Sequence, residues 1–284
     1  MVHTARHPKP GETLLGHGGE ITAGGKGANQ AVAAALLGTP VTFVGAVGSD
    51  AYAAPAMHYL KASGVNLEHV ARTDEVTGLA VITVDEQGEN TIIVVPGANA
   101  LVDAPFVTTH SSPITESELV LLQGEIPAEG FAKAIELATG RIVINLAPVI
   151  AVDKDALLRA DPLLANEHEA GLILEEFGLS AKGTPEELAQ RLRDAGFASV
   201  VLTLGARGAL VTEGTDLVAV PSPQVTPVDT TGAGDAFAGA LCARLLKGDS
   251  LVEAARYAAR VGAFAVTGAG AQASYPDRDT ELPS

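Results

Sequence analysis

Residues 229–246 read DTTGAGDAFAGALCARLL, and this stretch carries the strongest indication of both fold and function. A turn of small residues leads into a helix rich in Ala, whose short side chains permit close packing. Gly232 and Gly234 let successive backbone N–H groups point the same way at the positive end of the helix dipole. Such a turn stabilises anionic oxygen, so we expect Gly232, Ala233 and Gly234 to form an anion hole.

Asp235 falls in the first turn of the same predicted helix. Capping or compensation of the helix dipole explains most acidic residues at helix starts. Here the carboxylate directly follows the anion hole, so the hole can hold a phosphoryl group while the carboxylate accepts a hydroxyl proton. Phosphoryl transfer needs this pair of groups. We therefore interpret Asp235 as a general base, and we expect it to be ionised because the helix dipole favours its charge.

A second Gly-rich turn, GGKGANQ (24–30), opens an Ala-rich helix that ends near Gly38, and VTFVGAVG (41–48) is predicted to be the next strand. An ordinary loop with a solvated lysine explains such a turn. The alternative is a binding turn, in which the glycines bring backbone N–H groups close to a polyhydroxy ligand. Lys26 and Asn29, one helical turn apart, then offer a charged donor and an amide to its hydroxyls.

Two further segments follow predicted strands. Asn166 and Glu169 come directly after DPLLA, where the ends of parallel strands line a ligand crevice, so they are placed to hold a hydrated magnesium ion or phosphate oxygens. An N-capping Asn with acidic residues in the first helical turn explains the same composition. The second segment, TLGARG (203–208), is a strand end that turns through two glycines, and by itself it indicates only a turn.

Short apolar runs alternate with helical patterns from about residue 110 onward. The runs that we interpret as buried strands are LVLLQG (119–124), RIVINLA (141–147), DPLLAN (161–166) and SVVLTLG (199–205). Helical spacing occurs at 128–138, 167–177 and 184–196. Strands that are apolar on both faces and alternate with helices predict an α/β fold, with a parallel sheet covered by helices on both sides.

Residues 78–98 depart from this rhythm, because two β-rich runs are joined by a short polar loop. This pattern predicts a hairpin, and we interpret it as a small antiparallel lid with 11–23 as a possible partner strand. The rest of a single domain, 1–284, is then an α/β core of 24–77 and 99–284. Since the lid strands are apolar on both faces, we expect one face to cover a cleft and the other to form a homodimer.

The composition excludes several classes of function. With 18 Lys and Arg against 34 Asp and Glu, the formal net charge is −16, which opposes binding to nucleic-acid phosphates. The single cysteine, Cys242, permits no internal disulfide and fits a reducing compartment. We find no signal-peptide pattern and no apolar run of membrane-spanning length. We therefore expect a cytoplasmic protein with small-molecule ligands, and neither a nucleic-acid nor a membrane partner.

Taken together, in this order and spacing, the segments resemble the ribokinase-like (pfkB) family of sugar and nucleoside kinases. The segment 24–38 is similar to the first signature of the family and DTTGAGDAFAGAL to the second. NEHEA (166–170) is similar to its N-x-x-E element, 203–208 to its nucleotide-binding turn, and PGANA (96–100) and QGE (123–125) to its ribokinase branch. The resemblance covers roughly residues 8 to 276 and implies a three-layer parallel-sheet core with a small β lid.

The resemblance also implies an activity, the ATP-dependent phosphorylation of a sugar hydroxyl, with Asp235 as the general base beside the anion hole. The residues that it implies for the sugar are Gly25, Lys26, Asn29, Glu125 and Asp235. Those that it implies for ATP and Mg²⁺ are Asn166, Glu169 (through water to the metal), Thr203, Gly205 and Gly208. A monovalent cation, K⁺, is implied beside the anion hole, with Asp229, Thr231, Val266 and Ser274 as the matching positions.

The substrate is left open by the residues. A nucleoside kinase usually needs an aromatic or apolar wall for the base, and aromatic residues make up only 4% of this chain. A kinase of fructose phosphates would need a cationic clamp, and Lys26 is the only obvious candidate. These considerations favour D-ribose over fructose, its phosphates or a nucleoside. A non-catalytic protein that binds sugar or nucleotide is the alternative from a different class.

One departure from the family pattern concerns the N-terminus. Family members begin with a buried strand that carries a G-x-x-N-x-D element, whose Asn and Asp hold the sugar. Here Met1 lies only a few residues before HPKPGETLLG (7–16), which is similar to the family segment after that strand. We therefore expect the first core strand to be missing upstream of residue 1, through truncation or a misassigned start rather than natural loss. Removal of a central strand would expose two pairing edges and apolar surface.

Overall fold

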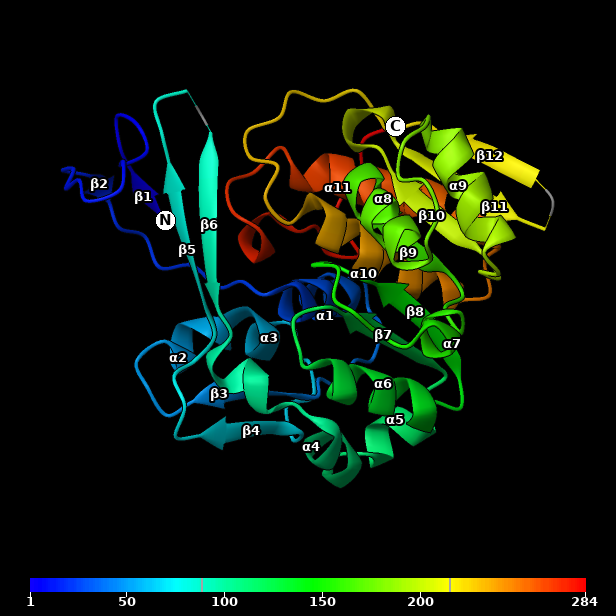
Figure 1. Cartoon of the computed structure of the whole chain (residues 1–284), viewed down its shortest axis with the longest axis horizontal. Coiled ribbons are helices and arrows are strands. Elements are labelled where there is room, and N and C mark those ends of the chain that lie inside the picture. Colours follow the sequence, from blue (N-terminus) through cyan, green and yellow to red (C-terminus); the bar gives the residue numbers. More distant parts are fainter. Residues whose placement is uncertain (88, 215) are drawn as a thin grey trace.

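The structure is a computed structural model that describes residues 1–87, 89–214 and 216–284. Its largest sheet has six strands in the order β12-β11-β10-β9-β8-β7 (Figure 1). Their bounds are β7 Leu119–Gln123, β8 Arg141–Asn145, β9 Leu163–Asn166, β10 Val200–Thr203, β11 Ala209–Glu213 and β12 Asp216–Val220. The first four are parallel, as the sequence predicts, whereas β11 and β12 run antiparallel at one edge.

Side chains of the parallel strands alternate between two cores, because successive residues of a strand point to opposite faces of the sheet. Val143, Leu164 and Val201 are buried in one core, and their chain neighbours Ile144 and Leu163 are buried in the other. The first core contains residues of α1 (Lys26–Leu36), α10 (Ala233–Leu245) and α11 (Leu251–Ala265), and the second those of α6 (Ala128–Leu137), α8 (Glu167–Glu176) and α9 (Pro185–Asp194). The predicted three-layer α/β core is therefore confirmed.

The helix α10 packs against both α1 and α11, and small residues make this close packing possible. A Cβ atom on Gly239 would lie 2.5 Å from the Gln30 carbonyl oxygen and 2.7 Å from the Cβ of Ala33. The Ala-rich character of the two signature segments therefore has a packing role. Cys242, also on α10, is buried, and burial raises the pKa of its thiol to about 12.

A second, two-stranded parallel sheet consists of β3 (Gly45–Gly48) and β4 (Val70–Thr73). The predicted strand 41–48 is thus shorter than expected, with only an isolated bridge at Thr42 before β3. Among the described residues β7 hydrogen-bonds only to β8, and β3 only to β4, so each sheet has an unpaired edge. The expectation of a further core strand stays a prediction. The remaining helical segments are α2 (Ala53–Ala56), α3 (His58–Ala62), η1 (Gly97–Leu101), α4 (Ala104–Thr109), α5 (Ser112–Glu116), α7 (Lys154–Leu157), η2 (Gly205–Arg207) and η3 (Gln272–Ser274).

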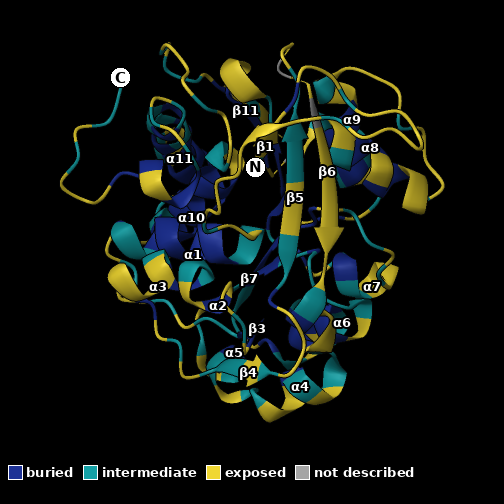
Figure 2. Cartoon of the chain, turned by 90° about the vertical axis from the view of Figure 1, so that its left-hand side faces the viewer, coloured by how far each residue is buried: buried dark blue, intermediate teal, exposed yellow. Residues whose placement is uncertain are grey.

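The lid is a four-stranded sheet with the order β2-β1-β5-β6. Its strands are β1 (Val2–His3), β2 (His17–Gly18), β5 (Leu79–Val84) and β6 (Asn90–Val95). The strands β5 and β6 form an antiparallel hairpin, but β1 lies between β2 and β5 and runs parallel to β5. The lid is therefore not antiparallel throughout, and the strand within 11–23 reaches the hairpin only through β1. Figure 2 shows much of β6 exposed.

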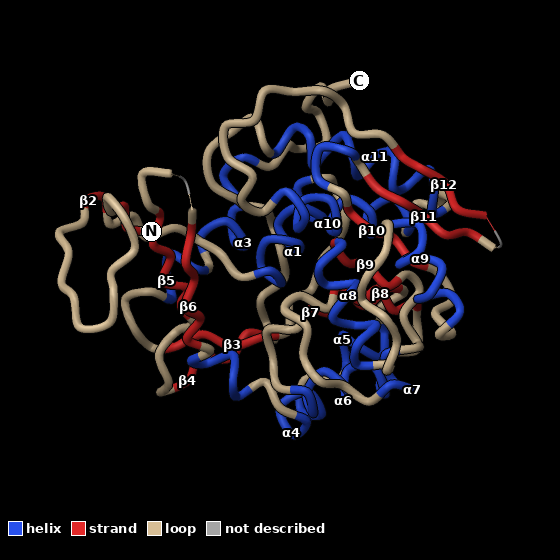
Figure 3. The backbone as a smooth tube through the Cα atoms, turned by 45° about the horizontal axis from the view of Figure 1, so that its top comes forward, coloured by secondary structure: helices blue, strands red, loops and turns tan. Residues whose placement is uncertain are grey.

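The hairpin of β11 and β12 was not expected from the sequence, where 203–208 indicates only a turn. The turn is followed at once by β11, and a Cβ on Gly208 would lie 2.0 Å from the Val220 carbonyl oxygen, so Gly208 permits the close approach of β12. Figure 3 shows the N-terminus beside the lid strands and the C-terminus near α11. No helix in the described part of the chain is both long and apolar enough to span a bilayer.

Candidate active site

The C-terminal ends of β8, β9 and β10 and the first turns of α1, α8 and α10 surround a cavity of about 130 Å³. The residues that line it are Lys26, Asn145, Leu164, Asn166, Glu169, Thr203, Gly232, Gly234 and Asp235. The structure thus brings together residues of four segments that the sequence singled out, 24–38, 166–170, 203–208 and 229–246, although they are up to 209 positions apart, from Lys26 to Asp235. This edge of a parallel sheet is the usual place for ligands in such folds.

The anion-hole turn has a backbone conformation that requires glycine. Gly232 precedes α10 with a φ of 73°, in the left-handed region, and its carbonyl oxygen accepts a hydrogen bond from the Tyr275 hydroxyl at 2.9 Å. A Cβ there would lie 2.5 Å from the Tyr275 oxygen and from the Cβ of Ala271. The Ala233 N–H donates to the Thr230 carbonyl oxygen at 3.3 Å. Since α10 has no side-chain cap and Ala236 N–H donates to the Gly232 carbonyl oxygen, the N–H groups of Gly234 and Asp235 are the ones in this turn that could bind an anion.

Asp235 does not cap its helix; its side chain points instead to α1. Asn29 donates to Oδ2 at 2.8 Å, and Gln30 donates to Oδ1 at 2.9 Å. Burial raises the pKa of Asp235, and the charge of Lys26 and the two amide hydrogen bonds oppose this rise. The helix start was expected to keep Asp235 ionised; burial works against the ionised form at a side chain that is only 7% exposed, so the ionised state of Asp235 stays a prediction.

Glu125, just after β7, is a second, partly buried acid near this cavity. One of its oxygens accepts the backbone N–H of Lys26 at 2.7 Å, so it caps the start of α1 from a distant part of the chain. Burial raises the pKa of Glu125, opposed by this hydrogen bond and the Lys26 charge and reinforced by the charge of Asp235. Gly25, with a φ of 90°, lies beside this carboxylate.

The side-chain amide of Asn29 uses more of its hydrogen-bonding capacity within the protein than the sequence indicates. Its Nδ2 donates to Asp235 and its Oδ1 accepts a hydrogen bond from Gln272 at 2.8 Å. Only one N–H of the amide is left for a ligand. Lys26, in contrast, has its side chain at the cavity. Lys26 and Asn29, which were predicted to bind the same ligand, therefore have different roles. Lys26 can bind the ligand, whereas Asn29 chiefly holds the Asp235 carboxylate in place.

Asn166 and Glu169 form a complete capping box at the start of α8, with hydrogen bonds of 2.8 Å in both directions. The capping interpretation is confirmed, and it coexists with their place at the cavity, because the box leaves out the second carboxylate oxygen of Glu169 and the Nδ2 group of Asn166. Thr203 also lines the cavity, while Gly205 and Gly208 lie outside its lining. Gly205 has open space around it, with a φ of 58°.

The positions that the resemblance implies for a monovalent cation lie on two loops that are joined by hydrogen bonds. The Asp229 carboxylate accepts the N–H groups of Thr231 at 2.9 Å and Gly270 at 2.8 Å. Burial tends to raise the pKa of Asp229, but these hydrogen bonds outweigh it and lower the pKa. The Val266 carbonyl oxygen already accepts two N–H groups, from Val228 and Asp229, so it has little capacity left for a cation. The Ser274 hydroxyl is hydrogen-bonded within its own loop.

Sequence reasoning missed four amides of the hydrogen-bonded group around Asp235, of which Asn145 lines the cavity: Gln30, Gln123, Asn145 and Gln272. Gln30 donates to Asp235, and Asn145 lines the cavity. A signal for Gln30 was present, because it is a polar residue at the start of the apolar run AVAAALL. The others are single polar residues at strand ends or in a loop, and nothing local indicates their partner.

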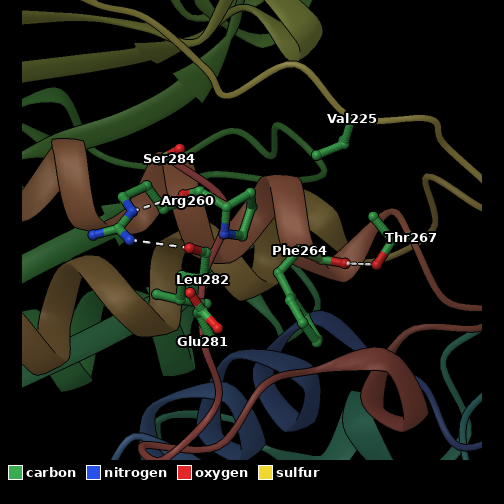
Figure 4. Close-up of a pocket in the computed structure, with 8 residues that line it drawn as sticks. Val225, Arg260, Phe264, Thr267, Glu281, Leu282 and Ser284 are labelled. Carbon is green, nitrogen blue, oxygen red and sulfur yellow. Dashed lines mark hydrogen bonds between the residues drawn. The ribbon is translucent and has the colours of Figure 1, made fainter.

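A larger cavity, of about 510 Å³, lies elsewhere (Figure 4). It is lined by Val225, Arg260, Phe264, Thr267 and the C-terminal residues 281–284. The Arg260 guanidinium donates to the carbonyl oxygens of Leu282 at 3.1 Å and Pro283 at 2.8 Å, as the dashed lines in Figure 4 show. None of the residues predicted for catalysis lines it, so we assign the chemistry to the smaller cavity.

Comparisons with known proteins show what the whole chain is similar to. The profile of the pfkB family of carbohydrate kinases matches residues 2–278. The ribokinase of Bacillus subtilis (strain 168) is 36% identical over 285 residues, which cover 98% of this chain and 93% of the relative. A ribokinase structure from Thermotoga maritima superposes with a TM-score of 0.90 at 32% identity and covers 98% of this chain and 92% of its own. Arabidopsis thaliana ribokinase complexed with ribose and ATP has a TM-score of 0.88 at 30% identity, with the same coverage.

Proposed function

Because this chain belongs to the pfkB family of carbohydrate kinases, we propose that it transfers the γ-phosphoryl group of ATP to D-ribose and forms ribose 5-phosphate. The observation that carries the proposal is the buried Asp235 carboxylate, which shares one cavity with the Gly232 turn and Lys26. The choice of ribose and ATP is supported by relatives that are ribokinases, one of them complexed with both molecules.

In the proposed reaction the oxygen of the ribose hydroxyl attacks the γ-phosphorus while Asp235 accepts the proton of that hydroxyl. ADP leaves with the electrons of the broken P–O bond. The N–H groups in the first turn of α10 stabilise the charge on the transferring group. Lys26 adds a positive charge at the same cavity. A base with a raised pKa suits this step, because it holds the proton more readily than an exposed carboxylate.

We place the nucleotide phosphates at the ends of β9 and β10, beside Asn166 and Thr203, with the turn at Gly205 and Gly208 next to them. Mg²⁺ keeps several of its waters and needs only one or two carboxylates. Glu169 fits this requirement, because it lines the cavity and the capping box uses only one of its two carboxylate oxygens. The ion would neutralise phosphate charge there.

The two loops that carry Asp229 and Ser274 fit a monovalent cation such as K⁺ in part. Asp229 supplies a carboxylate whose lowered pKa keeps it charged, and Thr231 supplies a carbonyl on the same loop. Val266 fits poorly, since its carbonyl oxygen is already used twice. A cation held between these loops would stabilise the conformation of the adjoining anion-hole turn. Measuring the rate in KCl against an equal concentration of tetramethylammonium chloride tests this role.

The experiment that tests the function is a coupled assay of ADP release by the purified chain. We expect Mg²⁺-dependent ATP consumption that rises with D-ribose and much less with fructose, fructose 6-phosphate or adenosine, with ribose 5-phosphate identified by ³¹P NMR. Asp235→Asn should lower kcat at least ~10²-fold, with ATP binding kept. Binding of ribose without ATP consumption would instead support a non-catalytic binding protein.

We also propose that two copies associate through the lid. The strand β6 exposes a run of large apolar side chains, with Ile92, Ile93 and Val94 each more than half exposed, and such patches mark interaction sites. A kinase that consumes ATP needs the ATP pool of the cell, and a single buried cysteine suits a reducing compartment, so we propose a cytoplasmic location.

A further inference from the structure

Five side-chain amides form one hydrogen-bonded group around the Asp235 carboxylate: Asn29, Gln30, Gln123, Asn145 and Gln272. An amide has a donor end and an acceptor end, and a half turn of its terminal group exchanges them. An ionised carboxylate can only accept. Which end each inner amide turns to Asp235 is therefore decided by the partners on its far side.

The branch through Gln30 begins at the backbone. Asn145 donates through Nδ2 to the Leu164 carbonyl oxygen at 3.0 Å, and because a carbonyl can only accept, this bond defines which way the Asn145 amide is turned. Its Oδ1 then faces Gln30 and accepts from Nε2 at 2.9 Å. On the other side, Gln123 donates to the Gln30 Oε1 at 2.7 Å. Gln30 can consequently present only N–H to Asp235.

The branch through Asn29 has no such anchor. Gln272 donates to the Asn29 Oδ1, but the Gln272 Oε1 is buried and has no hydrogen-bond partner among the described residues. A half turn of both amides would preserve the bond between them and would turn the oxygen of Asn29 toward Asp235. Of the two amides that touch the carboxylate, only Gln30 has its direction defined from the backbone.

We propose that Gln30 is a positioning residue for the phosphoryl transfer: anchored through Asn145 to the Leu164 carbonyl, it offers only a donor to Asp235 and so holds that carboxylate ionised and oriented to take the hydroxyl proton. The inference rests on the proposed role of Asp235 as the base. Gln30 is fully buried, so it acts through Asp235 and does not touch substrate.

The charged and titratable groups near Asp235 determine how the pKa of Asp235 would respond to loss of the Gln30 donor. Lys26, on α1, favours the ionised form of Asp235 and burial opposes it, while the Asp235 charge in turn raises the pKa of Glu125. Tyr275 stays neutral, because burial and the Asp235 charge raise the pKa of its hydroxyl. With Gln30 removed, Lys26 and Asn29 alone would oppose burial, so the pKa of Asp235 should rise further.

The test compares Gln30→Met with the matched variant Gln123→Met in the full chain. Methionine fills a similar volume without a strong donor or acceptor. In Gln30→Met the pKa of the Asp235 carboxyl, followed by ¹³C NMR without substrate and assigned with Asp235→Asn, should rise by at least about half a pH unit. The acid limb of kcat/KM should move with it, while KM for ATP stays within about twofold. In Gln123→Met the anchor through Asn145 remains, so the pKa of Asp235 and the acid limb of kcat/KM should both stay as in the wild type.

An unchanged Asp235 pKa in Gln30→Met, or an equal rise in Gln123→Met, would overturn the proposal. Should Gln30→Met not fold, Gln30→Glu keeps the shape of the side chain and turns a second carboxyl toward Asp235. The two carboxyls should then keep their last shared proton to a still higher pH than Asp235 does in the wild type. A carboxyl titration that is the same as in the wild type would again refute the proposal. The NMR measurement needs no substrate. A shift without any ribose phosphorylation would leave the positioning intact and overturn the proposed function instead.

Discussion

At the scale of single residues, the proposed function depends on a buried carboxylate, that of Asp235, which has to be ionised to act as the base. Burial raises the pKa of Asp235 above its ordinary value of 3.8, and the amides and Lys26 oppose the rise. Since the proposed base must be ionised, kcat/KM should fall as pH drops through this raised pKa, at a higher pH than an exposed aspartate would require. A pH profile with ribose measures this limb; an acid limb at or below pH 3.8 would contradict the assignment.

The same shift predicts how stability depends on pH. A carboxyl with a raised pKa in the folded state contributes stability that is present below its unfolded pKa and is lost as pH rises through its folded pKa. Asp235→Asn removes this loss. The free energy of unfolding of wild type relative to Asp235→Asn should therefore decrease as pH rises above about 4. Urea unfolding at a series of pH values measures it, and a flat difference would show that burial does not destabilise the charge.

Substitution of Gly232 can separate the cost of backbone strain from the cost of steric contact. Gly232→Ala combines a φ of 73° with a Cβ 2.5 Å from Ala271 and Tyr275, so we expect it to lower stability by about 2–4 kcal/mol and to disturb the anion hole, lowering kcat. Gly248→Ala is the matched control, with a φ of 88° and open space around it. It should cost only about 1–2 kcal/mol. Equal losses in both, by thermal unfolding, would argue against the steric contribution.

At the scale of elements, the site depends on how closely α10 approaches α1. A Cβ at Gly239 would meet the Gln30 carbonyl oxygen at 2.5 Å and so push apart the helices that carry Asp235 and its amides. We expect Gly239→Ala to cost about 1–3 kcal/mol and to lower kcat as well. Gly262→Ala on α11, whose nearest contact would be at 3.4 Å, should be neutral or stabilising by up to about 1 kcal/mol. Denaturant unfolding and kcat of both variants decide; similar values would refute the packing argument.

At the scale of the whole molecule, the lid carries the exposed apolar surface through which we propose that two copies associate. Ile93 on β6 is 62% exposed, so Ile93→Lys should abolish the proposed dimer, because a charge cannot be buried unpaired in an apolar interface. Leu179→Lys, on an exposed apolar residue at 40% exposure outside the lid, should leave it intact. Sedimentation velocity at micromolar concentration distinguishes them. A monomeric wild-type chain would contradict the proposal.

Much of this fold is predictable because its signals are local. The parallel strands are apolar runs of the right length, and the anion-hole turn at Gly232 needs glycines within a few residues. The amide group around Asp235 was not predictable, since Gln30, Gln123 and Gln272 acquire partners through contacts of 93 residues or more along the chain. The rise in the pKa of Asp235 was not predictable for the same reason: burial is a property of the packed molecule, whereas the helix dipole, on which the expectation of an ionised Asp235 rested, is a property of one element.

By itself the sequence determined the four parallel strands and the helices between them, the two Gly-rich turns and the identity of the acid that follows the second turn, because periodicity, glycine conformation and helix capping act over a few residues. Only the tertiary structure decided that Asp235 turns away from its own helix start toward Asn29 and Gln30, that Glu125 caps α1, and that the Val266 carbonyl is already used. The physical reason is that a buried polar group must find its partner wherever packing brings one within hydrogen-bond distance, whatever its place in the chain.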